Sequence, residues 1–262
     1  MKRLLFICFL FTVSVNSQEF IEATLVKKTD FTADVFVSTN NFETTFYVLD
    51  NVFFKNSKEI KGLDIGYSNF QLGNITSANT FNPLKINVFY RDFNTVLILD
   101  NRLAEIFKID FNSQSNYKNI SHISTGSDNT IWLFNQNTQQ IELFDYKTNT
   151  TRAKTLPIQN AVIDLKSNFN FCWVLTEKQL YMYDYFGNLI KKIKNQGFTS
   201  IVIDNENIVL RKDNALFYLR KNTEIMIPIN LPNLLINQFF VTNETLYIYD
   251  NEMLQQFQLK NL

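Results

Sequence analysis

The sequence has 262 residues, of which 45% are hydrophobic and 15% are aromatic. This apolar content is too high for a disordered chain and is sufficient for a substantial core. The 25 Lys and Arg residues balance 25 Asp and Glu residues, so the formal net charge is zero. A nucleic-acid binder normally carries a surplus of basic residues that neutralises phosphates, and the charge balance therefore argues against nucleic acid as a partner.

The first 17 residues, MKRLLFICFLFTVSVNS, have the layout of a secretory signal peptide. Lys2 and Arg3 form a positive start, residues 4–15 are an apolar run, and Ser17 fits a small-residue position before a cleavage site. The run is short for a membrane-spanning helix, although an uncleaved anchor is the alternative. The sequence therefore predicts an exported protein whose mature chain begins at Gln18.

The cysteine content predicts no stabilising disulfide bond in the mature chain. After removal of the signal peptide only Cys172 remains, and a single thiol forms no internal disulfide. Cys172 lies in the segment FNFCWVL, among large apolar side chains. We therefore predict a buried, unreactive thiol and a fold that is stabilised by packing and strand pairing.

Six segments of the chain share one pattern of three apolar strands separated by polar turns. They begin at Ala33, Lys85, Ser121, Ala161, Ser200 and Asn237. The tight turn between the second and third strands of each segment falls near Asp50, Asp100, Gln136, Glu177, Asp213 and Asp250. After the first pair, these turns recur every 36–41 residues, which is close to the period of four-stranded propeller blades. The longer first gap is interpreted as an insertion plus the fourth strand of the first unit.

This pattern resembles the β-propeller superfamily in period and strand order over nearly all of the mature chain. The Trp-Asp and Gly-His signatures of WD repeats and the glycine pairs of kelch repeats are absent, and no NHL signature is present. The resemblance implies an all-β, six-bladed β-propeller that forms a single domain over residues 18–262. Short strands at regular spacing are also compatible with a β-sandwich or barrel.

The two ends of the chain predict how the ring closes. The sixth segment stops at Leu262 without a fourth strand, and FIEATLVK, residues 20–27, precedes the first complete unit without another partner. We therefore predict that this N-terminal strand completes the last blade and removes its unpaired edge.

No catalytic residue is predicted. His122 is the only histidine, which excludes multi-histidine metal sites and leaves one base for a catalytic triad. Ser121 precedes it, but neighbouring residues on a strand point to opposite faces, so we expect the Ser121 hydroxyl not to reach the imidazole. We interpret His122 as a structural residue of an inner strand.

Two carboxylates are candidates for a cation site. Asp164 and Asp204 occupy matching places in the segments AVIDL and SIVID, the inner strands of the fourth and fifth units. Inner strands of a propeller line its central channel, where the two side chains would coordinate a cation or activate water, as carboxylates do in sugar lactonase-like propellers. The alternative is that both carboxylates are satisfied within the structure. No cofactor is predicted.

The aromatic residues Trp132, Trp173 and Tyr247 recur near the start of second strands, which favours packing between blades over ligand stacking. Together these observations favour an exported, non-enzymatic binding or scaffold protein of the periplasm, cell envelope or extracellular space, monomeric on its own. Its loops would recognise an envelope protein or a glycan. One alternative is a calcium-dependent, lactonase- or lyase-like enzyme with channel carboxylates. The other is a docking subunit peripherally associated with an outer-membrane assembly.

Overall fold

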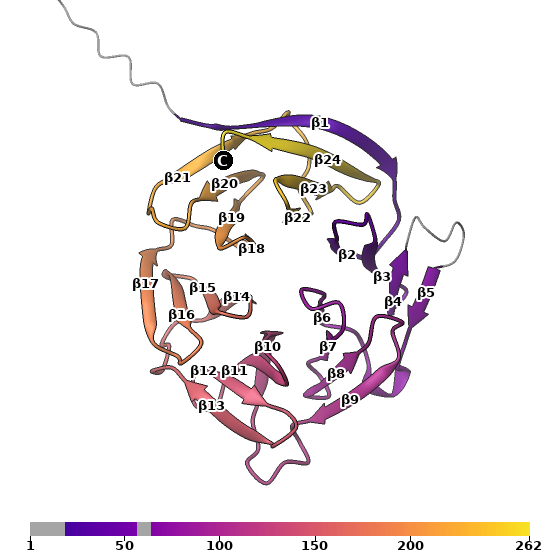
Figure 1. Ribbon diagram of the computed structural model, residues 1–262, viewed down its shortest axis with the longest axis vertical. Coiled ribbons are helices and arrows are strands. Elements are labelled where there is room, and N and C mark those ends of the chain that lie inside the picture. The colour runs from indigo at the N-terminus through magenta and orange to yellow at the C-terminus, as the bar shows by residue number, and fades with distance from the viewer. Residues whose placement is uncertain (1–18, 57–63) are drawn as a thin grey trace, which may run out of the picture.

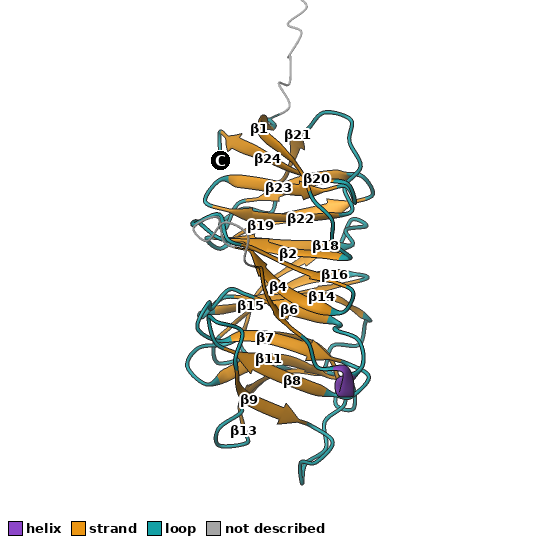
Figure 2. Cartoon of the chain, turned by 90° about the vertical axis from the view of Figure 1, so that its right-hand side faces the viewer, coloured by secondary structure: helices purple, strands orange, loops and turns teal. Residues whose placement is uncertain are grey.

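A computed structural model describes residues 19–56 and 64–262 and shows a ring of antiparallel sheets around a central opening (Figure 1). The predicted signal peptide, residues 1–17, lies outside the described residues. Viewed from the side, the strands cross the thickness of a disc and the turns lie on its two faces (Figure 2). The all-β ring confirms the predicted β-propeller and excludes a sandwich or a closed barrel. Within the described ranges, no helix is long and apolar enough to cross a membrane.

Four of the sheets are separate four-stranded blades, each with its strands in chain order. The first contains β2 (Val35–Thr39), β3 (Thr45–Leu49), β4 (Val52–Asn56) and β5 (Asp64–Tyr67). The second contains β6 (Ser77–Asn79), β7 (Ile86–Tyr90), β8 (Thr95–Leu99) and β9 (Glu105–Asp110). The third contains β10 (Ile120–Thr125), β11 (Thr130–Asn135), β12 (Gln140–Asp145) and β13 (Thr150–Lys154). The fourth contains β14 (Val162–Ser167), β15 (Phe171–Thr176), β16 (Gln179–Asp184) and β17 (Leu189–Lys194).

The rest of the ring is one eight-stranded sheet with the order β18-β19-β20-β21-β1-β24-β23-β22. Its strands are β18 (Ser200–Asp204), β19 (Asn207–Lys212), β20 (Ala215–Leu219), β21 (Met226–Asn230), β1 (Ile21–Asp30), β22 (Gln238–Thr242), β23 (Thr245–Tyr249) and β24 (Met253–Lys260). The predicted six separate blades are therefore wrong: the described chain has four blades and this larger sheet.

The eight-stranded sheet arises because β1 has two partners. It pairs antiparallel with β24 along most of its length, which confirms the predicted closure by the N-terminal strand. At its start, β1 also pairs in parallel with β21, through Ile21↔Ile229 and Glu22↔Asn230. This second contact, which the repeat pattern did not predict, merges the β18–β21 and β22–β24 groups into one sheet.

The second unit was also predicted one strand out of register. The turn at Asp100 lies between the third and fourth strands of its blade, not between the second and third. Its inner strand is β6, which falls in the stretch interpreted as an insertion. β6 has only three residues, Ser-Ala-Asn, so it shows no apolar pattern by which it could be recognised.

The two faces of the disc carry different connections. In each blade the first strand lies next to the central opening and the fourth at the rim (Figure 1). Because consecutive strands are antiparallel, the turns after the first and third strands emerge on one face, here called the first-turn face. The turns after the second strands and the segments that link neighbouring blades emerge on the other, the linker face. The 3-10 helix η1 (Phe70–Leu72), purple in Figure 2, lies on the linker face.

The core lies between neighbouring sheets rather than within them. Successive side chains of a strand point to opposite faces, so each strand contributes to two interfaces. In β11, Leu133 packs with Val96 and Ile98 of the preceding blade, whereas Trp132 packs with Leu165 and Cys172 of the following blade. Stacking of the sheets around the ring therefore buries both faces of each one, which is what a single four-stranded sheet cannot do.

Asparagine side chains join successive blades on the linker face. The turns after three of the second strands carry Asn51, Asn94 and Asn214. The side-chain NH2 group of each asparagine donates to a backbone carbonyl after the end of its blade. Its side-chain oxygen accepts from the backbone amide two residues later. The carbonyl and amide are Gly73 and Ile75 for Asn51, Lys118 and Ile120 for Asn94, and Leu234 and Ile236 for Asn214. Asn51 and Asn94 have positive φ angles of 60° and 49°, a conformation that asparagine tolerates better than most residues.

One ion pair is buried in the third blade. The ammonium of Lys118 lies 2.5 Å from Oε2 of Glu142, and both side chains are about 95% buried (6% and 5% exposed). Asn135 and Thr151 donate to the same carboxylate at 2.9 and 2.7 Å. Burial raises the pKa of Glu142, but the hydrogen bonds from Lys118, Thr151 and Asn135 outweigh it, so the pKa lies below its ordinary value.

Candidate functional site

The central opening of the ring contains a hollow of about 400 Å³. It is lined by residues of five inner strands, β2, β6, β14, β18 and β22, together with flanking turns and Arg211 of β19. Concave sites of this kind, where a few polar groups converge among apolar walls, are the usual place for ligand binding in a propeller or any other fold. The hollow is therefore the first candidate site.

Asp164, the first of the two predicted cation ligands, lines this hollow. Its oxygens already hold three donors: the amide of Leu165 at 2.9 Å, the amide of Ile201 at 3.0 Å and the ammonium of Lys166 at 3.0 Å. The Ile201 contact crosses from β14 to β18, so Asp164 joins two neighbouring sheets.

Asp204, the second predicted ligand, lies in a different hollow with Asn205, Tyr218 and Glu244. Its carboxylate accepts from the amides of Asn243 and Glu244, at 3.3 and 3.5 Å, in the turn after β22. Burial raises the pKa of Asp204 above its ordinary value, although these hydrogen bonds oppose the effect.

The structure thus places the two candidate ligands in separate hollows. In the chain outside residues 1–18 and 57–63, no cluster of three or more His, Cys, Asp or Glu side chains forms a site for a metal ion. The sequence match was misleading because Asp164 is the third of six residues in β14, whereas Asp204 is the last residue of β18. A β-bulge between Val162 and Asp164 shifts the register further, and β18 contains no such bulge.

His122 differs from its prediction. The Ser121 hydroxyl lies 2.9 Å from Nδ1 of His122, so the expectation that the serine cannot reach the ring is wrong. A β-bulge between Ile120 and His122 breaks the alternation of side chains and allows neighbouring residues to meet. Burial and the positive charge of Arg91 lower the pKa of His122, so the ring is neutral at pH 7. Ser121 is 94% buried, which leaves its hydroxyl without access to a substrate.

The turns after the first strands carry three exposed phenylalanines that sequence reasoning missed. Phe42, Phe81 and Phe169 lie in the turns after the first strands of the first, second and fourth blades, and are 74%, 50% and 43% exposed. Phe81 and Phe169 meet edge to face, with ring centroids 5.0 Å apart, although a whole blade separates them in the chain. Because first strands border the central opening, the turns that carry these rings lie on the side of one mouth of the hollow, which Phe81 itself lines.

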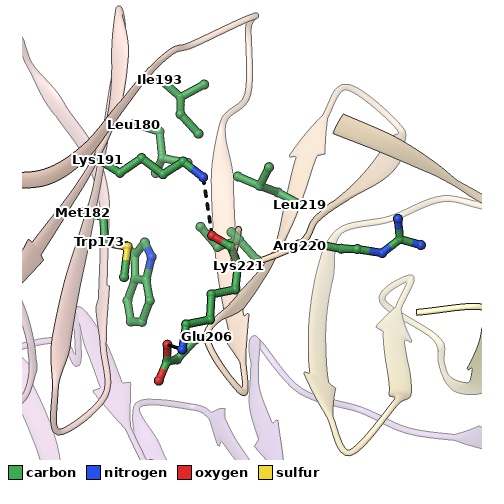
Figure 3. Close-up of a pocket in the computed structure, with 10 residues that line it drawn as sticks. Trp173, Leu180, Met182, Lys191, Ile193, Glu206, Leu219, Arg220 and Lys221 are labelled. Carbon is green, nitrogen blue, oxygen red and sulfur yellow. Dashed lines mark hydrogen bonds and ion pairs between the residues drawn. The ribbon is translucent and has the colours of Figure 1, made fainter. Parts of the chain in front are cut away.

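Trp173 forms part of a smaller cavity of about 20 Å³ between the fourth blade and the β18–β21 half of the large sheet (Figure 3). Lys191 closes one side by donating to the carbonyl of Thr223 at 2.5 Å and lying 3.4 Å from that of Lys221. Lys221 in turn pairs with Glu206 at 2.5 Å. The Lys191 contacts join the two sheets, so we assign this cavity to packing.

Other sequence expectations about burial are confirmed. Trp132, Trp173 and Tyr247 are at most 7% exposed and pack between neighbouring sheets. Cys172 is fully buried, and burial raises its thiol pKa, which disfavours the reactive thiolate.

No protein-family model matches the chain, and no curated protein matches its sequence. Among solved structures, it is similar to a streptogramin B lyase, with a TM-score of 0.64 and 11% identity over 90% of this chain and 88% of that one. Virginiamycin B lyase from Staphylococcus aureus gives a TM-score of 0.60 and 13% identity over 86% and 80%. A chain of the mitotic checkpoint complex gives 0.60 and 9% identity over 98% of both chains. At these identities the similarity shows the β-propeller fold alone.

Proposed function

We propose that this chain is an exported, non-enzymatic β-propeller that binds an envelope protein or glycan at its first-turn face, around the mouth of the central hollow. The observation that carries the proposal is the group of exposed aromatic rings, Phe42, Phe81 and Phe169, on the turns that border this mouth. The signal-peptide pattern of the first 17 residues supports export.

Exposed aromatic residues on loops are typical of recognition surfaces. A phenylalanine ring that remains in water gives up the free energy of burial, which is about 25 cal/mol for each Å² of apolar surface. A binding partner recovers this free energy by covering the ring, and aromatic side chains are accordingly frequent in binding interfaces. The rigid blades hold the turns in place, so the rings are presented with little loss of entropy on binding.

The enzyme alternative has less support from the geometry. Similarity to two lyases extends to the fold only. In the central hollow, the oxygens of Asp164 are occupied by three donors, and Asp204 lies elsewhere. The second alternative, docking to an outer-membrane assembly, would use the same first-turn face and is tested by the same experiment.

A pair of photo-crosslinkable variants tests the proposal. A crosslinking amino acid replaces Phe42 on the first-turn face, and the control carries it at Phe70 on the linker face, where exposure is almost the same, 74% and 73%. Both variants are produced in the native host with the intact N-terminus and are irradiated in cells. We expect a discrete, saturable adduct with an envelope component from the Phe42 position and none from the Phe70 position.

Two results would overturn the proposal. One is an adduct pattern that is the same from both positions. The other is a catalytic turnover by the wild-type protein that the variant Phe42→Ala has lost. Adducts only with cytoplasmic proteins would reject export.

A further inference from the structure

The central hollow has two chemically different walls. One wall consists of β14, β18 and the neighbouring β19, and carries Asp164, Lys166, Ser200 and Arg211. The other consists of β2 and β22, and carries the apolar residues Val35, Phe36, Phe239 and Phe240. β2 lies across the ring from β14 (Figure 1), so a molecule in the hollow has a polar wall on one side and an apolar wall on the other.

The negative charge of the polar wall is already engaged. Asp164 accepts from two backbone amides and pairs with Lys166, so its carboxylate has little capacity for a further donor. Lys166, by contrast, has a side chain that is 40% exposed, and its ammonium has three protons to donate. The Asp164–Lys166 pair has no net charge, and the more exposed of its two charged groups is the ammonium, since the Asp164 side chain is 17% exposed.

Arg211 adds a second cation next to this pair. It lies directly opposite Ser200 in the pairing of β18 with β19, one residue from the Ile201 amide that Asp164 binds. Its Nη1 donates to the carbonyls of Ile236 and Asn237, at 3.1 and 2.6 Å.

We propose that the central hollow binds a small organic anion with a flat apolar body. Its acidic group lies toward Lys166 and Arg211, and its body lies against the β2–β22 wall and Phe81 at the mouth. The acceptor oxygens of the acid complement the two cations, whereas the apolar body covers the opposite wall. This adds a small-molecule site to the binding function, and it does not depend on the partner at the first-turn face.

Two fluorescent probes separate the two parts of the inference. The anionic probe is 8-anilino-1-naphthalenesulfonate, and the neutral probe is N-phenyl-1-naphthylamine, which has the same aromatic body without the sulfonate. Each is titrated into the folded mature chain, with stoichiometry from calorimetry. We expect the sulfonate to bind at one site, about 10-fold more tightly than the neutral probe, because one good charge interaction in a partly buried site has this effect.

The test variant is Lys166→Met, which removes the charge and keeps the apolar stem of an exposed side chain. The control is Lys108→Met on the rim strand β9, where the side chain is also exposed. We expect Lys166→Met to weaken the sulfonate about 10-fold and leave the neutral probe unchanged, whereas Lys108→Met changes neither. Phe81→Ala should weaken both probes alike.

Arg211→Gln is a second variant, interpreted only where its melting curve shows a folded protein. The proposal is overturned if Lys166→Met leaves the sulfonate affinity unchanged, if the neutral probe binds as tightly as the sulfonate, or if the sulfonate binds at several equivalent sites. None of these outcomes would alter the crosslinking result at Phe42, so failure of this site and failure of the proposed function remain distinguishable.

Discussion

The hydroxyl of Tyr249 both accepts from the Ala33 amide, at 3.0 Å, and lies 2.9 Å from the Ala33 carbonyl, to which it donates. The two residues are 216 positions apart in the chain. Tyr249 is in β23, next to the C-terminal end, and Ala33 is in the segment between β1 and the first blade. This one side chain therefore fixes the seam where the two ends of the ring meet.

Tyr249→Phe is expected to destabilise the protein by about 1–3 kcal/mol, because it leaves backbone groups of Ala33 without their partner at a partly buried position. The ring of Tyr249 is 1% exposed, so phenylalanine keeps the packing and removes only the hydroxyl. Urea denaturation followed by tryptophan fluorescence measures the difference. Tyr117→Phe, at a 51% exposed position, is the control and should leave the midpoint unchanged. An unaltered midpoint for Tyr249→Phe would show that water replaces the hydroxyl without cost.

Ile21→Ala tests the double pairing of β1. Ile21 is fully buried and packs with Ile229 and Leu259, so the truncation should cost about 2–5 kcal/mol. Leu25→Ala, on the same strand but 45% exposed, should cost less than about 1 kcal/mol. Melting temperatures of the two variants give the comparison. Equal effects at the two positions would indicate that β1 contributes to stability only through its pairing with β24.

Glu142→Gln tests the buried ion pair at neutral pH. It leaves the Lys118 ammonium without its counter-charge, so we expect a loss of about 3–5 kcal/mol in the free energy of unfolding. The double variant Lys118→Met with Glu142→Gln should recover much of this loss. Urea denaturation of wild type, Lys118→Met, Glu142→Gln and the double variant at pH 7 forms the double-mutant cycle.

The same residue predicts a pH dependence. The pKa of Glu142 is lower in the folded than in the unfolded chain, so its contribution is complete above the unfolded value, about 4.5. That contribution is lost as the pH falls below this value and through the folded pKa. Wild type should therefore lose more stability than Glu142→Gln between pH 5 and pH 3. A parallel decline of both proteins would contradict the assignment.

His122 predicts a simple titration, because it is the only histidine and its NMR signals need no separation from others. Burial disfavours the charged ring, so the midpoint should lie below 6.5, the ordinary value. A folded pKa below the unfolded one means that protonation costs stability, which falls as the pH drops through 6.5. A midpoint at or above 6.5 would show that the ring is solvated in solution.

Several features of the fold were predictable because they depend on local pattern. β7 and β8 are fully buried five-residue strands with four apolar residues each, separated by a polar turn, so their pairing can be read from the sequence. The closing role of β1 was predictable because the last segment lacks a fourth strand and the N-terminal strand has no other partner. The parallel contact of β1 with β21 extends over two residues, too few to leave a pattern.

The candidate site was less predictable, because bulges decide which side chains meet. The bulge before His122 brings Ser121 to the imidazole, and the bulge before Asp164 separates its register from that of Asp204. A bulge inserts one residue without an apolar or polar signature, so strict alternation fails at these positions. The abundance of asparagine, interpreted as turn chemistry, has a further role: Asn51, Asn94 and Asn214 bind the next linking segment.

The pairing of β1 with β24 also sets the order of folding events. The first described strand of the chain has its main partner in the last, so no length of unfinished chain can complete the ring. The four separate blades have local contacts and can form as they emerge, whereas closure waits for the final residues. If such a chain crosses a membrane from its N-terminus, its ring stays unclosed during passage. The ring closes only after β24 has reached the far side.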